Sequence, residues 1–270
     1  MVRLFGPLVG LFFAVALLWS FAVGGVQAIR EPEPSTAVKD FHLAPKEVEF
    51  SFKGPFGKFD RAQLQRGFQV YKEVCSNCHA LKQIAFRNLT DLGYSEAEVK
   101  AIAKQWGTKA KTFDPKTGDA GERDNTPADH IPAVYYAGTG NPPDLSLITK
   151  ARHEGPEYVY SLLTGYAEQP AELLKKYPDS KVPEGLHYNP YFANLNIAMP
   201  APLTDGQVTY VDGTKATVDQ EAKDVSAFLT WTAEPKLEKR KQTGFAVLGF
   251  LLAATILAYL AKKNVWADKH

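Results

Sequence analysis

The pentapeptide Cys75-Ser76-Asn77-Cys78-His79 is the most informative stretch of this 270-residue sequence, because it holds both of the cysteines. On a helical turn, positions three apart lie on the same side, so both sulfur atoms can face one edge of a flat ligand. The histidine that follows directly can then reach the centre of that ligand. C-x-x-C-H is the attachment signature of c-type haem. We therefore expect one haem c, bonded through Cys75 and Cys78, with His79 as an iron ligand.

Two other uses of a C-x-x-C pair are disfavoured by its surroundings. A thioredoxin-like redox motif sits near a βαβ pattern, and the sequence shows none. A structural zinc site needs a second pair of cysteines or histidines at finger spacing, and there is no third cysteine. Since no cysteine is left over for a disulfide, the stability of the domain must come from packing and from the bound group.

The sixth ligand of the iron is expected to be Met199. A Met ligand raises the haem potential, and a His/Met pair is typical of electron-carrying cytochromes. Met199 is the only methionine besides Met1. Its surroundings, Ile197-Ala198-Met199-Pro200-Ala201-Pro202, form an apolar loop that proline stiffens, which can hold a thioether over a ring at low entropic cost. The alternatives are that Met199 packs in the core, or that His153 or His187 takes its place as ligand.

Four helical patterns surround the motif. They cover about residues 61–78, 95–106, 156–165 and 219–232, and the first two have capping signals: Asp60 as N-cap, and Ser95 with Glu98 as a capping box. The stretches at about 107–155 and 177–215 are expected to be irregular, apart from a small hairpin around Asp212-Gly213. The predicted fold class is mainly α, a c-type cytochrome domain with long loops. Wrapping a large flat cofactor is a good reason for loops of this length.

Both ends of the chain are apolar. Residues 1–28 have the pattern of a signal peptide, with Arg3, an apolar stretch and small residues up to Ala28, after which we expect cleavage. The alternative is an uncleaved membrane helix. Residues 244–261 carry no charge and are expected to form one C-terminal transmembrane helix. The predicted organisation is then an exported cytochrome c domain at 29–235, a basic linker at 236–243, the anchor, and a short cytoplasmic tail at 262–270.

The composition is ordinary for a globular protein, with 45% hydrophobic and 23% charged residues and a formal net charge of +1. So small a net charge argues against a general nucleic-acid-binding protein, which needs a basic excess to neutralise phosphates. The hydrophobic content argues against disorder. The segment 113–130 is modestly acidic, and it is either a solvated loop or a surface that steers a basic partner.

Beyond the haem motif, several blocks of sequence resemble the cytochrome c1 family, the c-haem subunits of quinol–cytochrome c reductase (cytochrome bc1) complexes. The resemblance covers about residues 40–266. Its blocks are Pro142-Pro143-Asp144-Leu145-Ser146, Ala151-Arg152-His153, YVYSLLTGY at 158–166, Asn189-Pro190-Tyr191-Phe192, Ile197-Ala198-Met199-Pro200, Ala222-Lys223-Asp224-Val225 and Ala233-Glu234-Pro235. Several blocks in order are far more specific than C-x-x-C-H alone.

The resemblance implies roles for eight residues. These are thioether bonds from Cys75 and Cys78, axial ligation by His79 and Met199, a haem-propionate contact from Arg152, and a pocket lined by Pro142, Pro143 and Tyr158. Some bacterial members of the family carry an extra disulfide. This chain cannot form it, so the rigidity that the bridge gives must arise differently here.

The resemblance also implies a function. In the family, the haem takes an electron from the Rieske iron–sulfur protein and passes it to cytochrome c, next to a cytochrome b subunit in a dimeric membrane complex. With both axial positions filled, the iron offers no site for a substrate, so the chain is expected to be an electron carrier without a substrate-turnover site of its own.

The plain N-terminal signal favours a single-pass protein of the bacterial inner membrane with the haem domain on the periplasmic side. Two other functions share the haem chemistry. One is a stand-alone anchored cytochrome that shuttles electrons to a terminal oxidase. The other is an enzyme or gas sensor with an open sixth position at the iron.

Overall fold

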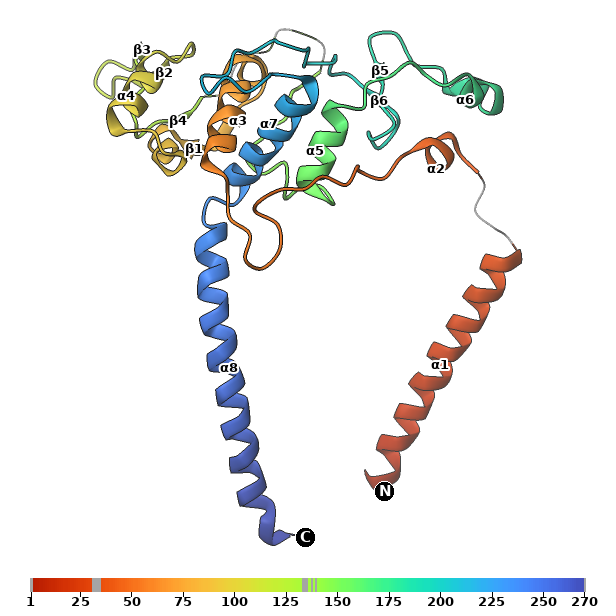
Figure 1. Ribbon diagram of the computed structural model, residues 1–270. Coiled ribbons are helices and arrows are strands. Elements are labelled where there is room, and N and C mark those ends of the chain that lie inside the picture. The colour runs from red at the N-terminus through yellow and green to blue at the C-terminus, as the bar shows by residue number, and fades with distance from the viewer. Residues whose placement is uncertain (1, 31–34, 133–135, 137, 139, 270) are drawn as a thin grey trace. The chain divides into compact units, whose positions relative to one another are not determined.

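The computed structural model describes residues 2–30, 35–132, 136, 138 and 140–269 (Figure 1). The chain divides into two compact units. One unit consists of the residues up to His42 together with Pro170–Lys181, and the other of Leu43–Gln169 and the residues from Val182 onward. The first unit contains α1 (Val2–Arg30), α2 (Ala37–Phe41), α6 (Ala171–Lys176) and the 3-10 turn η3 (Pro178–Ser180).

The second unit contains the haem motif, and its fold is mainly α, as the sequence predicts. Its helices are α3 (Arg61–Glu73), α4 (Glu96–Lys104), α5 (Gly155–Leu163), α7 (Val218–Ala233) and α8 (Leu237–Trp266), with 3-10 turns η1 (Cys75–Asn77), η2 (Phe86–Leu92) and η4 (Ala267–Lys269). Its strands form three antiparallel pairs: β1 (Leu81–Ala85) with β4 (His130–Ile131), β2 (Ala110–Phe113) with β3 (Ala120–Arg123), and β5 (His187–Tyr188) with β6 (Asn196–Ile197). Pairs of this size cannot build a core, so helices must do so.

The four predicted helices are present, with ends within a few residues of those expected. The first ends at Glu73 instead of reaching Cys78, because the chain tightens into η1 at the cysteines. Asp60 caps α3, and its carboxylate accepts hydrogen bonds from two backbone N–H groups of the first turn, at 2.9 and 3.3 Å. The capping box of Ser95 and Glu98 on α4 is formed in both directions.

The prediction of a hairpin around Asp212-Gly213 is wrong. Residues 204–217, all of them described, contain no strand. The loop instead makes side-chain contacts with α3: Tyr210 is buried, and a guanidinium nitrogen of Arg66 donates to the Asp212 carboxylate at 2.7 Å. These contacts with the helix take the place of strand pairing.

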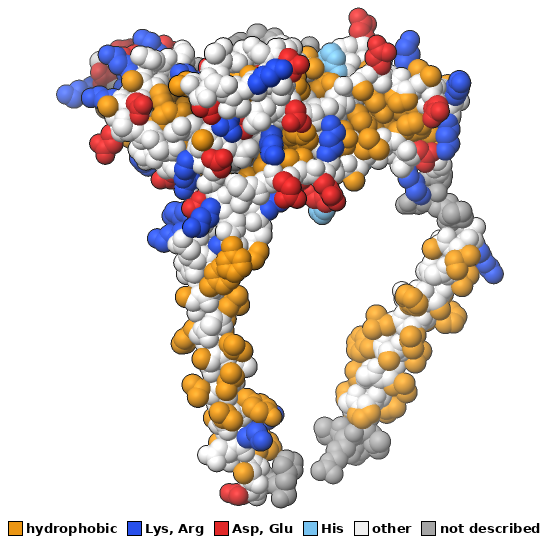
Figure 2. Space-filling model, viewed as in Figure 1, with side chains coloured by type: hydrophobic (Ala, Val, Ile, Leu, Met, Phe, Trp, Pro, Cys, Tyr) orange, Lys and Arg blue, Asp and Glu red, His pale blue; other side chains and the backbone are white. Residues whose placement is uncertain are grey.

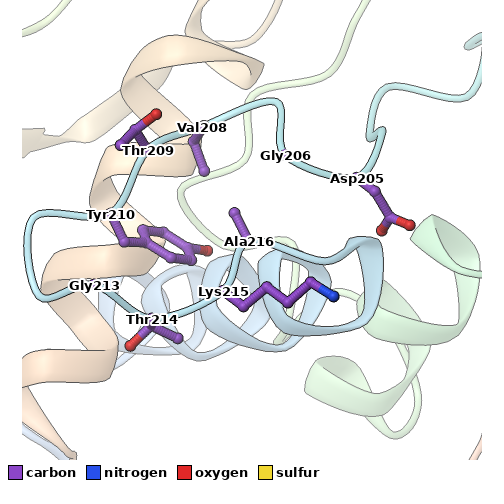
Figure 3. A pocket seen from close by; sticks show the side chains of 9 residues that line it. All are labelled: Asp205, Gly206, Val208, Thr209, Tyr210, Gly213, Thr214, Lys215 and Ala216. Carbon is purple, nitrogen blue, oxygen red and sulfur yellow. The ribbon is translucent and has the colours of Figure 1, made fainter.

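A hollow of about 440 Å³ lies at this loop (Figure 3). It is lined by Asp205, Gly206, Val208, Thr209, Tyr210, Gly213, Thr214, Lys215 and Ala216. None of these is a predicted haem-site residue, so the hollow is distinct from the site that the sequence indicates.

The core of the second unit is centred on the crossing of α3 and α7. At Gly67 a side chain would overlap the carbonyl oxygen of Asp224 and would lie 2.7 Å from the Cβ atom of Phe228, so the helices meet backbone to backbone. An aromatic cluster extends from this point, with the rings of Phe68 and Tyr71 centred 5.6 and 5.7 Å from that of Phe228. The crossing fixes the end of α3, from which the haem motif continues directly.

A buried polar network reinforces the crossing. Asp224 is fully buried, and Arg66 Nε donates to its Oδ2 atom at 2.8 Å. The side-chain amides of Gln63 and Gln220 donate to Oδ1 at 3.2 and 2.8 Å. A buried carboxylate needs a charged partner and several donors, and Asp224 has both. The network therefore ties α3 to α7 through side chains as well.

Glu221, one turn earlier on α7, is buried without such partners. Its side chain is fully buried, and no side-chain donor reaches either carboxyl oxygen. Burial raises the pKa of this carboxyl above its ordinary value of 4.5, against an opposing effect of the Val208 backbone N–H. The nearby carboxylates of Asp205, Asp224 and Glu73 raise this pKa further. Folding therefore shifts the ionisation equilibrium of this carboxyl toward its protonated form.

Glu221→Gln is expected to raise the free energy of unfolding at neutral pH, by about 1 kcal/mol. A raised pKa in the folded state contributes stability that is complete below the ordinary pKa of 4.5 and is lost as pH rises through the folded-state pKa. Glutamine does not ionise, so the gain of the variant should be small in acid and should grow toward neutral pH. Denaturant titration of the haem-loaded protein across this range measures it. Glu168→Gln, at an exposed position, is the control, and a gain that does not change with pH would contradict the interpretation.

Among the described residues, two helices are long and apolar enough to cross a membrane, over Phe5–Arg30 and Leu237–Trp266. The second is α8, which includes the segment 244–261 predicted as the anchor. Residues 237–243 of the predicted basic linker belong to the same helix. The first is α1, which contains the predicted signal peptide, and cleavage after Ala28 stays a prediction.

The start of α8 is held to the rest of the second unit by two side chains. Glu238 accepts a hydrogen bond from the backbone N–H of Phe59 at 2.9 Å. The Nζ atom of Lys241 donates to the carbonyl oxygens of Phe52 and Gly54 at 2.7 and 2.6 Å. Since α7 ends only a few residues earlier, the helix is joined to the rest of the second unit without a free linker.

Candidate haem-binding site

The two cysteines are presented by the turn that follows α3. Backbone N–H groups of Cys78 and His79 both donate to the carbonyl oxygen of Cys75, at 3.1 and 2.8 Å, and so close the turn. Both thiols are free and half-buried. Burial, with a smaller effect of Cys78, raises the pKa of the Cys75 thiol to about 12. Both sulfur atoms are thus carried on one turn, as attachment of the two to a single macrocycle requires.

The imidazole of His79 is oriented by a backbone carbonyl. Its Nδ1 atom lies 2.8 Å from the carbonyl oxygen of Pro143. A carbonyl can only accept, so Nδ1 must carry the proton and Nε2 keeps its lone pair for a metal. Histidine ligands generally use their second nitrogen in this way, which fixes the tautomer and the ring orientation. The predicted haem-pocket residue Pro143 is therefore brought into direct contact with the predicted ligand.

The segment that carries Pro143 is fixed beside the motif by several further hydrogen bonds. The backbone N–H of Leu145 donates to the carbonyl oxygen of Ala80 at 3.0 Å. The Asp144 carboxylate accepts from the backbone N–H of Lys82 at 2.8 Å and from that of Ser146 at 3.0 Å. Asp144 and Ser146 lie within a block that the sequence singles out, but their supporting role was not predicted. An acidic residue after two prolines, with serine two positions later, is the signal of such a turn.

Met199 is half-buried in the loop after β6. The hydroxyl of Tyr166, just beyond α5, donates to the backbone carbonyl oxygen of Met199 at 3.0 Å. No hydrogen bond within the described part of the chain joins residues 197–202 directly to the Cys75–His79 turn. Each of the two predicted ligands thus has its own supporting hydrogen bond. Tyr166 lies in the sequence block at 158–166, but its role as a positioning residue was not predicted.

Arg152 and Tyr158 lie together. The guanidinium carbon of Arg152 is 5.9 Å from the centre of the Tyr158 ring, and one of its nitrogens donates to the carbonyl oxygen of Ala151 at 3.0 Å. The side chain is exposed, and no described carboxylate lies within ion-pair distance of it. Arg152 is therefore available for an added carboxylate such as a haem propionate, and that role stays a prediction. Pro142 is half-buried next to Pro143.

The histidines considered as replacement ligands lie on the surface. His153 and His187 are both exposed, and His187 belongs to β5. No hydrogen bond within the described part of the chain orients either imidazole in the way that Pro143 orients His79. The structure therefore supplies no positioning group for ligation by these residues.

The acidic segment 113–130 contains β3 and the end of β2. The guanidinium of Arg123 forms a two-pronged ion pair with Asp129, at 2.6 and 2.7 Å, and Asp114 caps the hairpin turn by accepting from the backbone N–H of Lys116 at 2.8 Å. The carboxylates of Asp114 and Asp129 thus stabilise the conformation of the segment itself. The idea that the segment docks a partner stays a prediction.

The donor set fits a c-type haem. It offers two free thiols on one turn, an imidazole whose Nε2 is left for iron, and one thioether in a supported loop. Within the described residues, no group of three or more histidine, cysteine, aspartate or glutamate side chains gathers into a metal-ion site. Two thiols, an imidazole and a thioether are the donor types that a covalently attached haem uses.

Comparison with known proteins agrees with this chemistry. The Cytochrome C1 family profile matches residues 50–269. The chain belongs to the cytochrome C1 family. It is 46% identical to "Cytochrome c1" of Rhodospirillum rubrum, over 82% of the chain and 88% of that protein. It is 40% identical to "Cytochrome c1" of Cereibacter sphaeroides, over 82% of the chain and 87% of that protein.

A third relative in the cytochrome C1 family is longer. "Cytochrome b/c1" of Bradyrhizobium diazoefficiens is 45% identical over 95% of the chain, and the chain spans 40% of its length. The resemblance that the sequence blocks indicated is confirmed, and so is the expectation of a haem protein, since relatives in this family are named as such.

Proposed function

We propose that this protein is the haem-bearing electron-transfer subunit of a cytochrome b–c1 complex, which takes electrons from the Rieske iron–sulfur protein and passes them to cytochrome c. The observation that carries the proposal is the contact of His79 Nδ1 with the Pro143 carbonyl oxygen, at 2.8 Å, within a member of the cytochrome C1 family. An imidazole held in this way keeps its Nε2 atom aimed for ligation of the haem iron, which supports the proposal.

The residues of this chain hold the haem in place and tune its reduction potential. Bound haem c supplies one-electron chemistry at its iron. Cys75 and Cys78 would attach it, His79 and Met199 would ligate its iron, and Arg152 would pair with a propionate. With both residues bound to the iron, no ligand position would remain for a substrate, and the haem would exchange electrons without forming a bond to its partner.

The proposed setting is a single-pass protein of the bacterial inner membrane, with α8 as the anchor and the haem domain on the periplasmic side after cleavage of residues 1–28. Proposed neighbours are a cytochrome b subunit and membrane lipid, in a complex that is dimeric. What supports this setting is the apolar length of α8 and α1 and the family, in which a relative is named "Cytochrome b-c1 complex catalytic subunit, mitochondrial".

The test is to extract the tagged protein from membranes in mild detergent and to record a reduced-minus-oxidised spectrum after adding quinol. Co-purification of b-type haem, with quinol reducing both haem types, is the expected result. A Cys75→Ser/Cys78→Ser variant is the matched control, in which the c-type band should be absent. A preparation that holds only c-type haem and ignores quinol, once loss of subunits in detergent has been excluded, would favour the anchored shuttle instead.

A further inference from the structure

The depth of α8 in a membrane follows from its sequence. The uncharged run from Gly244 to Ala261 spans roughly 27 Å at about 1.5 Å per residue, close to the ~30 Å hydrocarbon core of a bilayer. Residues 237–243 of the same helix are rich in charge. They therefore stand at the level of the lipid headgroups, on the side of the cytochrome domain.

The loop before α3 reaches this same level. The ring of Phe56, which is 78% exposed, stacks on that of Phe245 with centroids 5.1 Å apart and planes at 9°. Aromatic rings are favoured where hydrocarbon meets the headgroups. Since Phe245 stands at the start of the uncharged run, the stacked pair marks the boundary between hydrocarbon and headgroups.

Basic side chains gather at the boundary. Lys58, Lys236, Lys239 and Arg240 are all exposed. Figure 2 shows Lys and Arg side chains collected over the start of α8, with hydrophobic side chains following along the helix. Lys58 is placed there because both of its neighbours contact α8, Gly57 through Lys241 and Phe59 through Glu238. We call Phe56, Lys58, Lys236, Lys239, Arg240 and Phe245 the collar.

Most of the charge of the collar is not neutralised by the protein. Arg240 is paired with Glu234. Lys58, Lys236 and Lys239 have no side-chain partner among the residues that the structure describes. Lys241 differs from them, because its ammonium is turned toward backbone carbonyls of the loop. The collar thus combines three ammonium groups that lack a described side-chain partner with the stacked rings of Phe56 and Phe245.

We propose that the collar binds the phosphate groups of anionic phospholipids in the leaflet next to the cytochrome domain. Cations near an anionic membrane surface attract such lipids, and the stacked rings offer an apolar surface for the adjoining acyl chain. The inference goes beyond the electron-transfer role and depends only on α8 crossing the membrane. Its failure would leave that role untouched, because quinol-driven haem reduction is measured separately.

The test is a lipid titration of the haem-loaded full chain in neutral detergent, followed by native mass spectrometry, with phosphatidylglycerol compared against phosphatidylcholine. The parent protein carries Lys262→Gln and Lys263→Gln, so that the basic residues at the far end of α8 do not contribute. The collar variant adds Lys236→Gln and Lys239→Gln to this parent. The matched control receives Lys100→Gln and Lys104→Gln instead, two exposed lysines of α4.

The parent and the control are expected to bind phosphatidylglycerol more tightly than phosphatidylcholine. The collar variant should lose roughly five-fold in phosphatidylglycerol affinity for each lysine removed, with an unchanged affinity for phosphatidylcholine and an unchanged haem spectrum. The proposal is overturned if the parent shows no preference for the anionic lipid, or if the collar variant binds it as tightly as the control does.

Discussion

Met199→Leu is expected to lower the reduction potential of the haem by on the order of a few hundred millivolts while the haem stays covalently attached. The two effects should separate, because the proposed attachment is through Cys75 and Cys78, whereas a thioether ligand would act by stabilising the reduced iron. Leucine preserves the volume of the side chain and removes only the sulfur donor. A redox titration of the purified protein, with the c-type band as readout, measures the shift.

Carbon monoxide distinguishes a lost ligand from a merely disturbed pocket. The reduced leucine variant should bind it, because the sixth position is open, whereas the wild type should not. Met199→His is the matched control, since it lowers the potential but fills the position again. An unchanged potential in the leucine variant would eliminate Met199 as ligand and would turn attention to His153 or His187.

Gly67→Ala is expected to have the largest effect on stability, about 3 kcal/mol or more. The added methyl group would overlap the carbonyl oxygen of Asp224, and backbone cannot swing aside as a flexible side chain can. Separating the helices would also stretch the bonds between Arg66 and Asp224 and would loosen the packing of Phe228. Denaturant titration of the haem-loaded protein gives the loss in free energy of unfolding.

The control for Gly67 is Gly107→Ala. No atom lies within 4 Å of a side chain at Gly107, so this change should be nearly neutral. Comparable losses in the two variants would show that α3 and α7 do not approach as closely as the structure has them. A lower yield of haem-loaded Gly67→Ala protein would agree with the expected loss, because the crossing positions the turn that carries the cysteines.

The helices and the haem motif could be predicted from the sequence because their signals are local. Periodic apolar residues and the caps at Asp60 and Ser95 mark α3 and α4, and C-x-x-C-H is specific within five residues. The expected hairpin at Asp212 failed for the opposite reason. Its turn signal is real, but the side chain of Asp212 is bound by Arg66, which is remote in sequence. The strands of the long loops were missed because two- to five-residue pairs carry too few side chains for an alternating pattern to show.

The positioning of the ligands could be predicted least. His79 is oriented by the backbone carbonyl oxygen of Pro143. Because every residue has such a carbonyl group, the residue type does not indicate this role in the sequence. The same holds for Met199, whose backbone carbonyl oxygen accepts a hydrogen bond from the Tyr166 hydroxyl. Sequence blocks pointed to these segments, but the atoms that make the contacts are evident only in the folded structure.

The attachment of α8 to the cytochrome domain has a consequence for how electrons travel. Glu238 and Lys241 bind the loop of residues 52–59. The connection between α7 and α8 is only a few residues long, so it leaves no flexible hinge between the domain and α8. A haem carried on this domain would keep a fixed height and orientation relative to the membrane helix. If electrons must cover a longer distance, the donor and the acceptor have to diffuse or change conformation to reach it.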